Sequence, residues 1–240
     1  MRSIYHFRIN HIVIKLCGHK YEKSNGGGKL IMLEQLLIEL NDRGAHMIRS
    51  LDISSLPSEI RRGLDYAIVY TIPLHPQDKW DWSTFDHAEK KGEALAKWLT
   101  QEIISLGYEA YPHTLENVFN SRTLRSPLPN KTLAVLAGLG WIAKNALLIS
   151  PEYGSALSIA AVLTSIVLPA QNMPTIASRC GDCTICQKVC TPGALKGQLW
   201  KPGLLRKQLL DAPQCTECFQ CLAQCPWTQR YHQRCTRHQT

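Results

Sequence analysis

The chain has 240 residues, 45% hydrophobic and 19% charged, a composition that is normal for a folded globular protein and excludes an intrinsically disordered one. Its longest apolar run stops at Pro169 after about ten residues, too few to cross a bilayer. The first twenty residues have neither a long apolar region nor a small-residue cleavage site, so we expect a cytoplasmic protein without a secretory signal or membrane contact.

Ten cysteines and a formal net charge of +8 are the unusual features of the composition. Cysteine-rich secreted proteins are usually small and carry a signal peptide, so in this chain the cysteines indicate metal ligation rather than disulfides. The net charge is +4 over residues 1–28, −1 over 29–195 and +5 over 196–240. Such basic ends either offset the negative charge of thiolate ligands or bind RNA or an acidic partner.

The first 28 residues end in three glycines and lack helical periodicity, which predicts a flexible N-terminal extension. Leucines at helical spacing then predict a helix that starts at Lys29 and ends near residues 41–44. The elements expected next are a strand over 46–49, a short helical turn opened by Ser55 and Pro57, and a second strand over 66–72.

A long helix is expected over residues 84–106, with Thr84 as its cap and Gly107 at its end. The remaining elements of this part are a strand over 108–111, a helix over 131–139 stopped by Gly140, and strands over 146–149 and 157–168. Strands that alternate with helices indicate an α/β layered core.

From Ser178 onward, regular periodicity gives way to cysteine, proline and glycine. This change predicts a boundary near residues 169–174. The expected organisation is an extension over 1–28, an α/β cofactor-binding core over 29–172, and a two-cluster domain with a basic tail over 173–240.

Two cysteine runs in the last part share the spacing C-x2-C-x2-C-x3-C. The first run is Cys180, Cys183, Cys186 and Cys190, and the second is Cys215, Cys218, Cys221 and Cys225, followed by Pro226. This is the spacing with which bacterial ferredoxins hold 4Fe–4S clusters. Zinc ribbons use pairs of C-x2-C and leave no role for a third and fourth cysteine at this spacing, twice over. The doubled motif therefore predicts two 4Fe–4S clusters.

Geometry predicts how the eight thiolates divide between the clusters. Three thiolates in a tight loop grip three corners of one cubane, while the fourth points away and ligates the other cluster. One cluster is expected on Cys180, Cys183, Cys186 and Cys225, and the other on Cys215, Cys218, Cys221 and Cys190. Clusters of this kind transfer single electrons at low potential.

Three residues depart from the pattern or lie outside it. Thr191 separates Cys190 from the following proline, which the motif prefers directly after the cysteine, but proline supplies no ligand. Cys17 and Cys235 lie outside both runs and are interpreted as free thiols.

The densest motif of the core is AGLGWIAKN at 137–145, followed by PEYGS at 151–155. Gly138 and Gly140 permit close backbone approach at a helix end, and Lys144 and Asn145 place polar groups beside it. The motif has the spacing of neither a dinucleotide-binding fingerprint nor a P-loop. On the residues alone, a glycine-rich packing turn is the simpler interpretation.

Three stretches together carry a specific resemblance: AGLGWIAKNALLISPEYGS at 137–155, CGDCTICQKVCTPGAL at 180–195, and the second cysteine run with Trp227 after it. They resemble the epoxyqueuosine reductase family, in particular its shorter double-cluster relatives, and the resemblance covers about residues 29–230. It implies a fold of the mixed α/β (α+β) class, with a nitroreductase-like core that binds cobalamin followed by a bacterial ferredoxin-like two-cluster module.

The resemblance also implies a reaction, in which reduced cobalamin removes an oxygen atom from epoxyqueuosine in tRNA; related enzymes dehalogenate their substrates reductively. The residues that would contact the corrin are Gly138, Gly140, Trp141, Lys144, Asn145, Tyr153, Gly154 and Ser155. The implied partners are a low-potential electron donor of the ferredoxin or flavodoxin type, and tRNA or a corrinoid protein.

Two departures from the family pattern bear on this reaction. The family continues past the second cysteine run into helical repeats that help to hold tRNA, whereas this sequence stops at Thr240. The family also carries an aspartate proton donor about fourteen residues before the first glycine of the motif, a place that Leu124 takes here. Leucine cannot donate a proton. Glu116 and His113 lie at least eight residues away, so the catalytic residues stay unassigned.

The remaining ring side chains have ordinary interpretations. His75, His87 and His113 are expected to be surface or packing residues rather than cobalt ligands. The tryptophans expected in the core or in a cofactor wall are Trp80, Trp82, Trp141 and Trp227.

Three hypotheses follow from the sequence. The first is a corrinoid-using reductase of the epoxyqueuosine reductase type. The second is an electron-transfer protein that reduces a corrinoid on a partner, and the third is a basic RNA-binding protein with structural clusters. The missing aspartate favours the second hypothesis over tRNA chemistry, whereas the broad α/β core favours the first.

Overall fold

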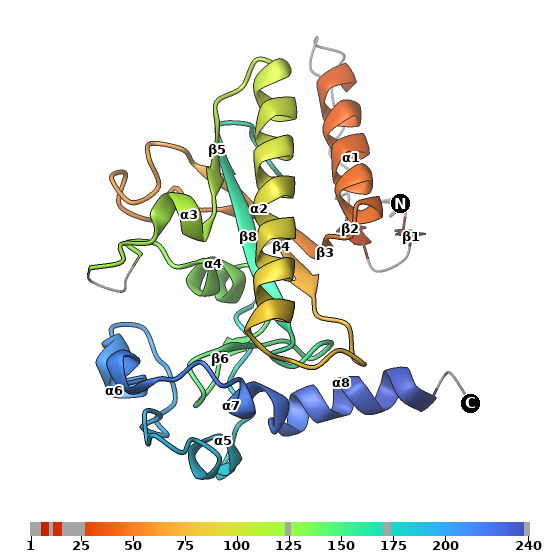
Figure 1. Ribbon diagram of the computed structural model, residues 1–240. Coiled ribbons are helices and arrows are strands. Elements are labelled where there is room, and N and C mark those ends of the chain that lie inside the picture. Colours follow the sequence, from red (N-terminus) through yellow and green to blue (C-terminus); the bar gives the residue numbers. More distant parts are fainter. Residues whose placement is uncertain (1–5, 10–11, 16–26, 123–125, 170–173, 238–240) are drawn as a thin grey trace.

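The computed structural model describes residues 6–9, 12–15, 27–122, 126–169 and 174–237 (Figure 1). At its centre is an antiparallel sheet with the strand order β3-β4-β8-β5. These strands are β3 (His46–Asp52), β4 (Tyr66–Pro73), β5 (Ala110–His113) and β8 (Leu157–Thr164). The expected strands over 46–49 and 66–72 are confirmed.

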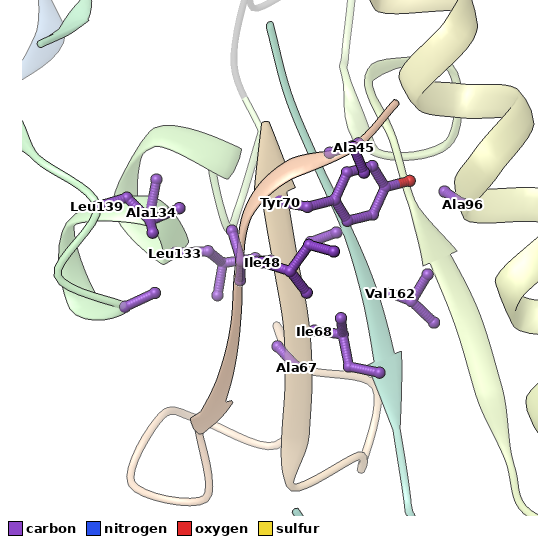
Figure 2. Packing of buried hydrophobic residues seen from close by; sticks show 14 of the residues in the cluster. Ala45, Ile48, Ala67, Ile68, Tyr70, Ala96, Leu133, Ala134, Leu139 and Val162 are labelled. Carbon is purple, nitrogen blue, oxygen red and sulfur yellow. The ribbon is translucent and has the colours of Figure 1, made fainter. Parts of the chain in front are cut away.

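Helices cover both faces of this sheet. Helix α2 (Trp82–Ser105) lies on one face with α1 (Gly27–Asp42) beside it, and α4 (Asn130–Leu136) lies on the other (Figure 1). Figure 2 shows Ala96 of α2 and Leu133 of α4 on opposite sides of the strands. Because both faces are covered, β4 is buried almost continuously instead of alternately. The layered, mixed α/β core expected from the sequence is confirmed.

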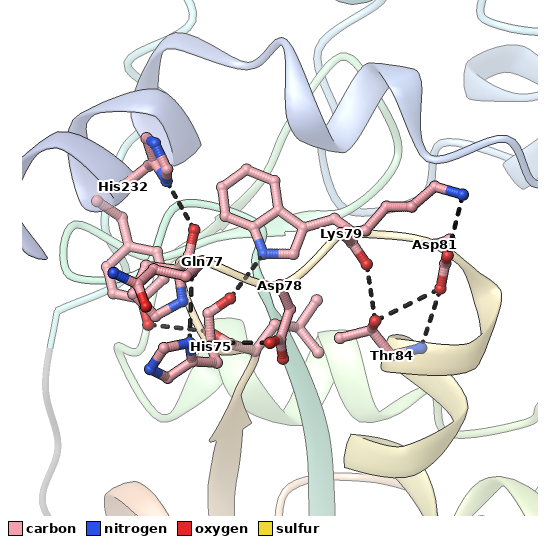
Figure 3. Close-up of polar contacts among 11 residues, drawn as sticks. His75, Gln77, Asp78, Lys79, Asp81, Thr84 and His232 are labelled. Atoms are coloured by element: carbon pink, nitrogen blue, oxygen red, sulfur yellow. Dashed lines mark hydrogen bonds and ion pairs between the residues drawn. The ribbon is translucent and has the colours of Figure 1, made fainter. Parts of the chain in front are cut away.

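The long helix expected over 84–106 is α2, but its cap is Asp81 rather than Thr84. The Asp81 carboxylate accepts a hydrogen bond of 3.2 Å from the backbone N–H of Thr84 (Figure 3). The Thr84 hydroxyl instead donates to the carbonyl of Lys79. At the other end Gly107 has a φ of 86°, which confirms its part in ending the helix.

Several expected boundaries shift. The first 28 residues contain a hairpin, β1 (His6–Ile9) and β2 (Ile12–Lys15), that the sequence analysis did not predict, and α1 starts at Gly27. The short helical turn expected after Pro57 is present, because the Pro57 carbonyl accepts from the backbone N–H groups of Ile60 at 3.2 Å and Arg61 at 3.4 Å. The strand expected over 108–111 is β5, which starts two residues later and is followed by the short helix α3 (Leu115–Val118).

The helix expected over 131–139 is α4, and it ends before Gly138, whose φ is 68°. The expectation that Gly140 stops this helix is therefore wrong. Gly140 directly precedes a second pair of antiparallel strands, β6 (Trp141–Ile142) and β7 (Leu148–Ile149). Of the strand expected over 146–149, only residues 148 and 149 are in a strand.

The cysteine-rich part contains short elements and one longer helix: α5 (Ile185–Lys188), α6 (Arg206–Leu209), the 3-10 helix η1 (Ala212–Gln214), α7 (Gln220–Ala223) and α8 (Pro226–Arg237). Helix α8 runs along the core, where the Tyr231 hydroxyl donates to the carbonyl of Leu74 and His232 Nδ1 donates to that of Pro76 (Figure 3). No helix in the described ranges is long and apolar enough to span a bilayer.

Candidate metal centre

The two cysteine runs fold alike. Helices α5 and α7 lie side by side, and each carries the third cysteine of its run, Cys186 or Cys221. The fourth cysteine, Cys190 or Cys225, follows two residues after each helix ends.

Thiols from both runs line one cavity of about 200 Å³: Cys180, Cys183, Cys186 and Cys225, called here the first thiol set. Burial, and after it the charges of the nearby Cys180, Cys225 and Cys183 thiolates, together raise the pKa of Cys186 to about 11. Cys225 is itself buried, in a cluster with Trp141 and Ala143 of the core. These are the four cysteines that the sequence assigns to one cluster.

The other four thiols gather around Cys221 and are called here the second thiol set: Cys190, Cys215, Cys218 and Cys221. Burial, and after it the charges of the Cys215, Cys186, Cys218 and Cys190 thiolates, together raise the pKa of Cys221 to about 12. Because Cys186 of the first set is among these neighbours, the two sets are adjacent. Cys215 and Cys218 are exposed, whereas no cysteine of the first set is.

The raised pKa values mean that without metal these thiols keep their protons at neutral pH, so metal binding would release protons. Within the described ranges, no three His, Cys, Asp or Glu side chains stand close enough to share a single metal ion. The four thiols of the first set line a cavity of about 200 Å³, an arrangement that fits a multi-iron cluster held at its corners.

Two adjacent core residues hold both cysteine loops. The Lys144 ammonium donates to the carbonyls of Gly181 and Cys183 at 2.7 and 3.1 Å, in the first run. The Asn145 amide donates to the carbonyl of Cys221 at 3.2 Å, in the second run. Both residues lie in the turn between β6 and β7, and both line the cavity of the first thiol set. The position of the two loops relative to the core therefore depends on this turn.

Residues 153–155, which follow β7, pack against helix α8. The Ser155 backbone N–H donates to the Thr228 hydroxyl at 3.0 Å, and the two hydroxyls are also 3.0 Å apart. A Cβ on Gly154 would overlap the backbone of Thr228. The Tyr153 hydroxyl is 2.9 Å from His46 Nδ1, and its ring meets Tyr231 edge to face. All three residues predicted to contact a corrin here are buried against protein.

The glycine motif is also packed against protein atoms. A Cβ on Gly140 would overlap the backbone carbonyl of Ile149, whereas Gly138 provides the left-handed turn after α4. Trp141 is buried and meets Trp227 edge to face, with ring centroids 5.0 Å apart. Packing between the core and the cysteine-rich part accounts for these residues. Their contact with a corrin stays a prediction.

His113 and Glu116, the two residues considered as proton donors, both interact with other groups of the protein. His113 is 2% exposed and contacts the Leu128 carbonyl through Nε2 at 2.7 Å, and burial lowers its pKa, so it is neutral at pH 7. Glu116 forms an exposed ion pair of 2.6 Å with Lys97. Leu124 lies outside the described residues, as does Cys17.

The other ring side chains and Cys235 divide between surface and core. His75 and His87 are exposed, as expected. Cys235 is half-buried against the core. Trp82 is 52% exposed at the start of α2, so its expected place in the core or a cofactor wall is wrong; it lies beside Phe85 and Phe219 instead.

Sequence reasoning missed two arginines at the first thiol set. Arg230 stacks over the Trp227 ring with its guanidinium carbon 4.7 Å from the centroid, and Arg179 lies at 6.0 Å from the same ring. Both line the cavity. Two signals were available: Arg179 directly precedes Cys180, and Arg230 follows Trp227 by about one helical turn.

A second cavity, of about 490 Å³, lies at the end of β3 and is lined by residues 51–53, 55, 56, 136, 174 and 175. None of the predicted site residues lines it.

Comparison with known proteins gives consistent relatives, although no family model matches the chain. An epoxyqueuosine reductase from Synechocystis sp. is 30% identical over 208 residues, which cover 78% of this chain and 67% of that relative. The Escherichia coli epoxyqueuosine reductase is 30% identical over 104 residues, or 43% of this chain and 27% of the relative.

Solved structures show the same fold. A crystal structure of epoxyqueuosine reductase has a TM-score of 0.59 at 17% identity, and the match covers 83% of this chain and 66% of that one. A variant of a catabolic reductive dehalogenase has a TM-score of 0.64 at 19% identity, covering 86% of this chain and 33% of that one. The matched part of this chain thus spans about two thirds of the Synechocystis relative and of the solved reductase, 27% of the Escherichia coli relative, and one third of the dehalogenase.

Proposed function

The chain belongs to the epoxyqueuosine reductase family, and from this premise we propose that it binds two 4Fe–4S clusters and acts in one-electron reduction. Family membership supports a reductase role. The observation that carries the proposal is the division of the eight motif cysteines into two adjacent sets, each built from both runs. When bound, such clusters supply single-electron transfer at low potential.

The proposed ligands are the first thiol set for one cluster and the second thiol set for the other. The alike folds of the two runs support a ferredoxin-like module over residues 173–240. A nitroreductase-like core over 29–172 is proposed with it, supported by the antiparallel sheet covered on both faces.

The exposure of the two sets supports an order for electron transfer. Cys215 and Cys218 of the second set face solvent, where a low-potential donor of the ferredoxin or flavodoxin type would reach them. Cys225 of the first set is buried against Trp141 of the core. Electrons are therefore proposed to enter at the second set and leave from the first.

A corrinoid is the proposed electron acceptor, in line with a solved reductive dehalogenase of similar fold for which a B12-dependent dehalogenation mechanism is suggested. Of the residues predicted to contact the corrin, Lys144 and Asn145 line the cavity of the first thiol set, but Gly140 and Gly154 face protein backbone, which leaves no room for a corrin against these two glycines. This observation favours the second candidate function, in which the chain delivers electrons to a corrinoid bound by a partner protein.

An RNA partner is a further part of the proposal. One epoxyqueuosine reductase of similar fold, with a TM-score of 0.57, has been solved with a tRNA stem loop. In this chain α8 carries the basic side chains Arg230, Arg234 and Arg237. These charges support contact with tRNA, in addition to the corrinoid protein.

Cobalamin titration of anaerobically reconstituted protein distinguishes the two acceptor arrangements. A corrinoid site on this chain predicts binding at micromolar cobalamin with a change to the base-off spectrum. A site on a partner predicts no binding, together with reduction of a separately supplied corrinoid protein by the dithionite-reduced chain. Failure to reduce any corrinoid by a chain that holds its clusters would contradict the proposed acceptor.

A further inference from the structure

The charged side chains that line the cavity of the first thiol set are all positive. Three cationic side chains line it, Lys144, Arg179 and Arg230, and no carboxylate of the described ranges does. Four thiolates around a cubane carry negative charge, so the chain's own residues place counter-charges on the wall of this cavity.

These cations are held in place. The Arg230 guanidinium stacks on Trp227 at 4.7 Å, and Arg179 lies over the same ring at 6.0 Å. Such stacking restrains a side chain that would otherwise sample many rotamers in solvent. Lys144 is fixed by its two bonds to carbonyls of the first cysteine run. The positive charges thus have defined positions relative to the thiols.

Each cysteine run carries one carboxylate directly before its second cysteine, Asp182 before Cys183 and Glu217 before Cys218, and neither lines the cavity of the first thiol set. The charge of Glu217 also acts on Glu89 of α2, together with the charges of Glu93 and Asp86. Carboxylates therefore accumulate where α2 approaches the second cysteine run.

One-electron reduction makes a 4Fe–4S cluster more negative without breaking a bond or moving a proton. A nearby positive charge stabilises the reduced state and raises the reduction potential, and a negative charge lowers it. Solvent at Cys215 and Cys218 also stabilises a reduced cluster in the second set. The effect of the arginines is therefore isolated by changing them, not by comparing one cluster with the other.

We propose that Arg179 and Arg230, stacked on Trp227, selectively raise the reduction potential of the cluster on the first thiol set, so that the transferred electron comes to rest on the side of the core. This inference rests on the proposed function, because it requires both clusters. It adds to that function the residues that give the transfer its direction.

The test is a potentiometric titration of the anaerobically reconstituted chain at low ionic strength, followed by electron paramagnetic resonance. In the double variant Arg179→Gln/Arg230→Gln, one of two midpoint potentials should fall while the other stays. The expected size is about a tenfold change in the ratio of reduced to oxidised cluster at fixed potential, which is about 59 mV for one electron.

Two variants control for loss of structure. Arg230→Lys keeps the charge and should keep the potential near that of the wild type. Arg234→Gln removes a charge from the same helix, but Arg234 contacts the Glu152 carbonyl and does not line the cavity, so both potentials should stay unchanged. Iron content is measured for every variant.

The outcomes separate this inference from the proposed function. A wild-type chain with about eight iron atoms, and a double variant with the same iron content and unchanged potentials, would overturn the inference and leave the proposed function standing. Equal shifts of both potentials would also overturn it, because the effect would not be selective. A wild-type chain that binds no clusters would overturn the proposed function, and the inference with it.

Discussion

At the scale of single residues, Asn145 joins the core to the second cysteine run through a buried side chain. Its side chain is 4% exposed, donates to the Cys221 carbonyl and accepts from the backbone N–H of Leu147. Asn145→Ala leaves both backbone groups without this partner and should lower the free energy of unfolding by about 1–3 kcal/mol. Urea unfolding measures the change. Asn120→Ala, at an exposed side chain, is the control, and an equal loss in both variants would contradict the assignment.

Gly140 tests whether the glycine motif is a packing turn. Its added Cβ would overlap the Ile149 carbonyl, which belongs to the backbone and cannot rotate away. Gly140→Ala should therefore cost about 3 kcal/mol of unfolding free energy. Gly92→Ala is the matched control, because its Cβ would come no closer than 3.3 Å to Ala160 and alanine favours the helix. Wild-type stability of Gly140→Ala would contradict the packing role.

At the scale of elements, helical periodicity was sufficient to predict the long helix α2, and continuous apolar runs were sufficient to predict the central strands β4 and β8, which are buried almost throughout. Their ends were less predictable, because caps depend on which side chain reaches the free N–H groups. Asp81 accepts the bond that had been expected from Thr84, and the motif contains both Gly138 and Gly140, only one of which ends a helix. The two-residue strands of the β6–β7 hairpin are too short to show alternation.

Helix α2 also carries an acid that makes stability depend on pH. Burial, and after it the negative charges of Glu93, Asp86 and Glu217, together raise the pKa of Glu89 from 4.5 to about 7. The folded chain therefore holds a proton that the unfolded chain loses, so stability falls as pH rises from 4.5 to about 7.

Glu89→Gln removes this dependence. The variant should be more stable than the wild type above pH 7, by about 1 kcal/mol after allowance for solvent screening of a half-buried group, and equal to it below pH 4.5. Urea unfolding at pH 4.5, 6 and 8 measures the difference. The exposed Glu59→Gln is the control. A stabilisation that is the same at all three pH values would contradict this explanation.

For the whole molecule, the sequence predicted the division into a layered core and a cysteine-rich part, because periodicity and cysteine spacing are local signals. It did not predict how the parts join. The bonds from Lys144 and Asn145 to backbone carbonyls carry no sequence signature on the accepting side. Arg179 and Arg230 become site residues only because Trp227 brings them together over one cavity.

At the scale of the whole molecule, reduction of epoxyqueuosine by this chain would need a proton donor, and the resemblance to the family implies an aspartate at the place that Leu124 takes. We therefore expect the chain to restore little queuosine to tRNA in bacteria that lack epoxyqueuosine reductase. Leu124→Asp should increase queuosine, since a positioned acid contributes about 10² to 10⁴ in rate. Mass spectrometry of tRNA measures it, with Leu124→Asn as the control. Full restoration by the wild type would show that another acid serves.

The central claim is that the eight motif cysteines hold two cubane clusters, and iron and acid-labile sulfide analysis of the anaerobically reconstituted chain tests it most directly. The two thiol sets predict about eight iron and about eight sulfide per chain. About four of each would contradict the claim for one of the two sets. Zinc without sulfide would contradict it for both.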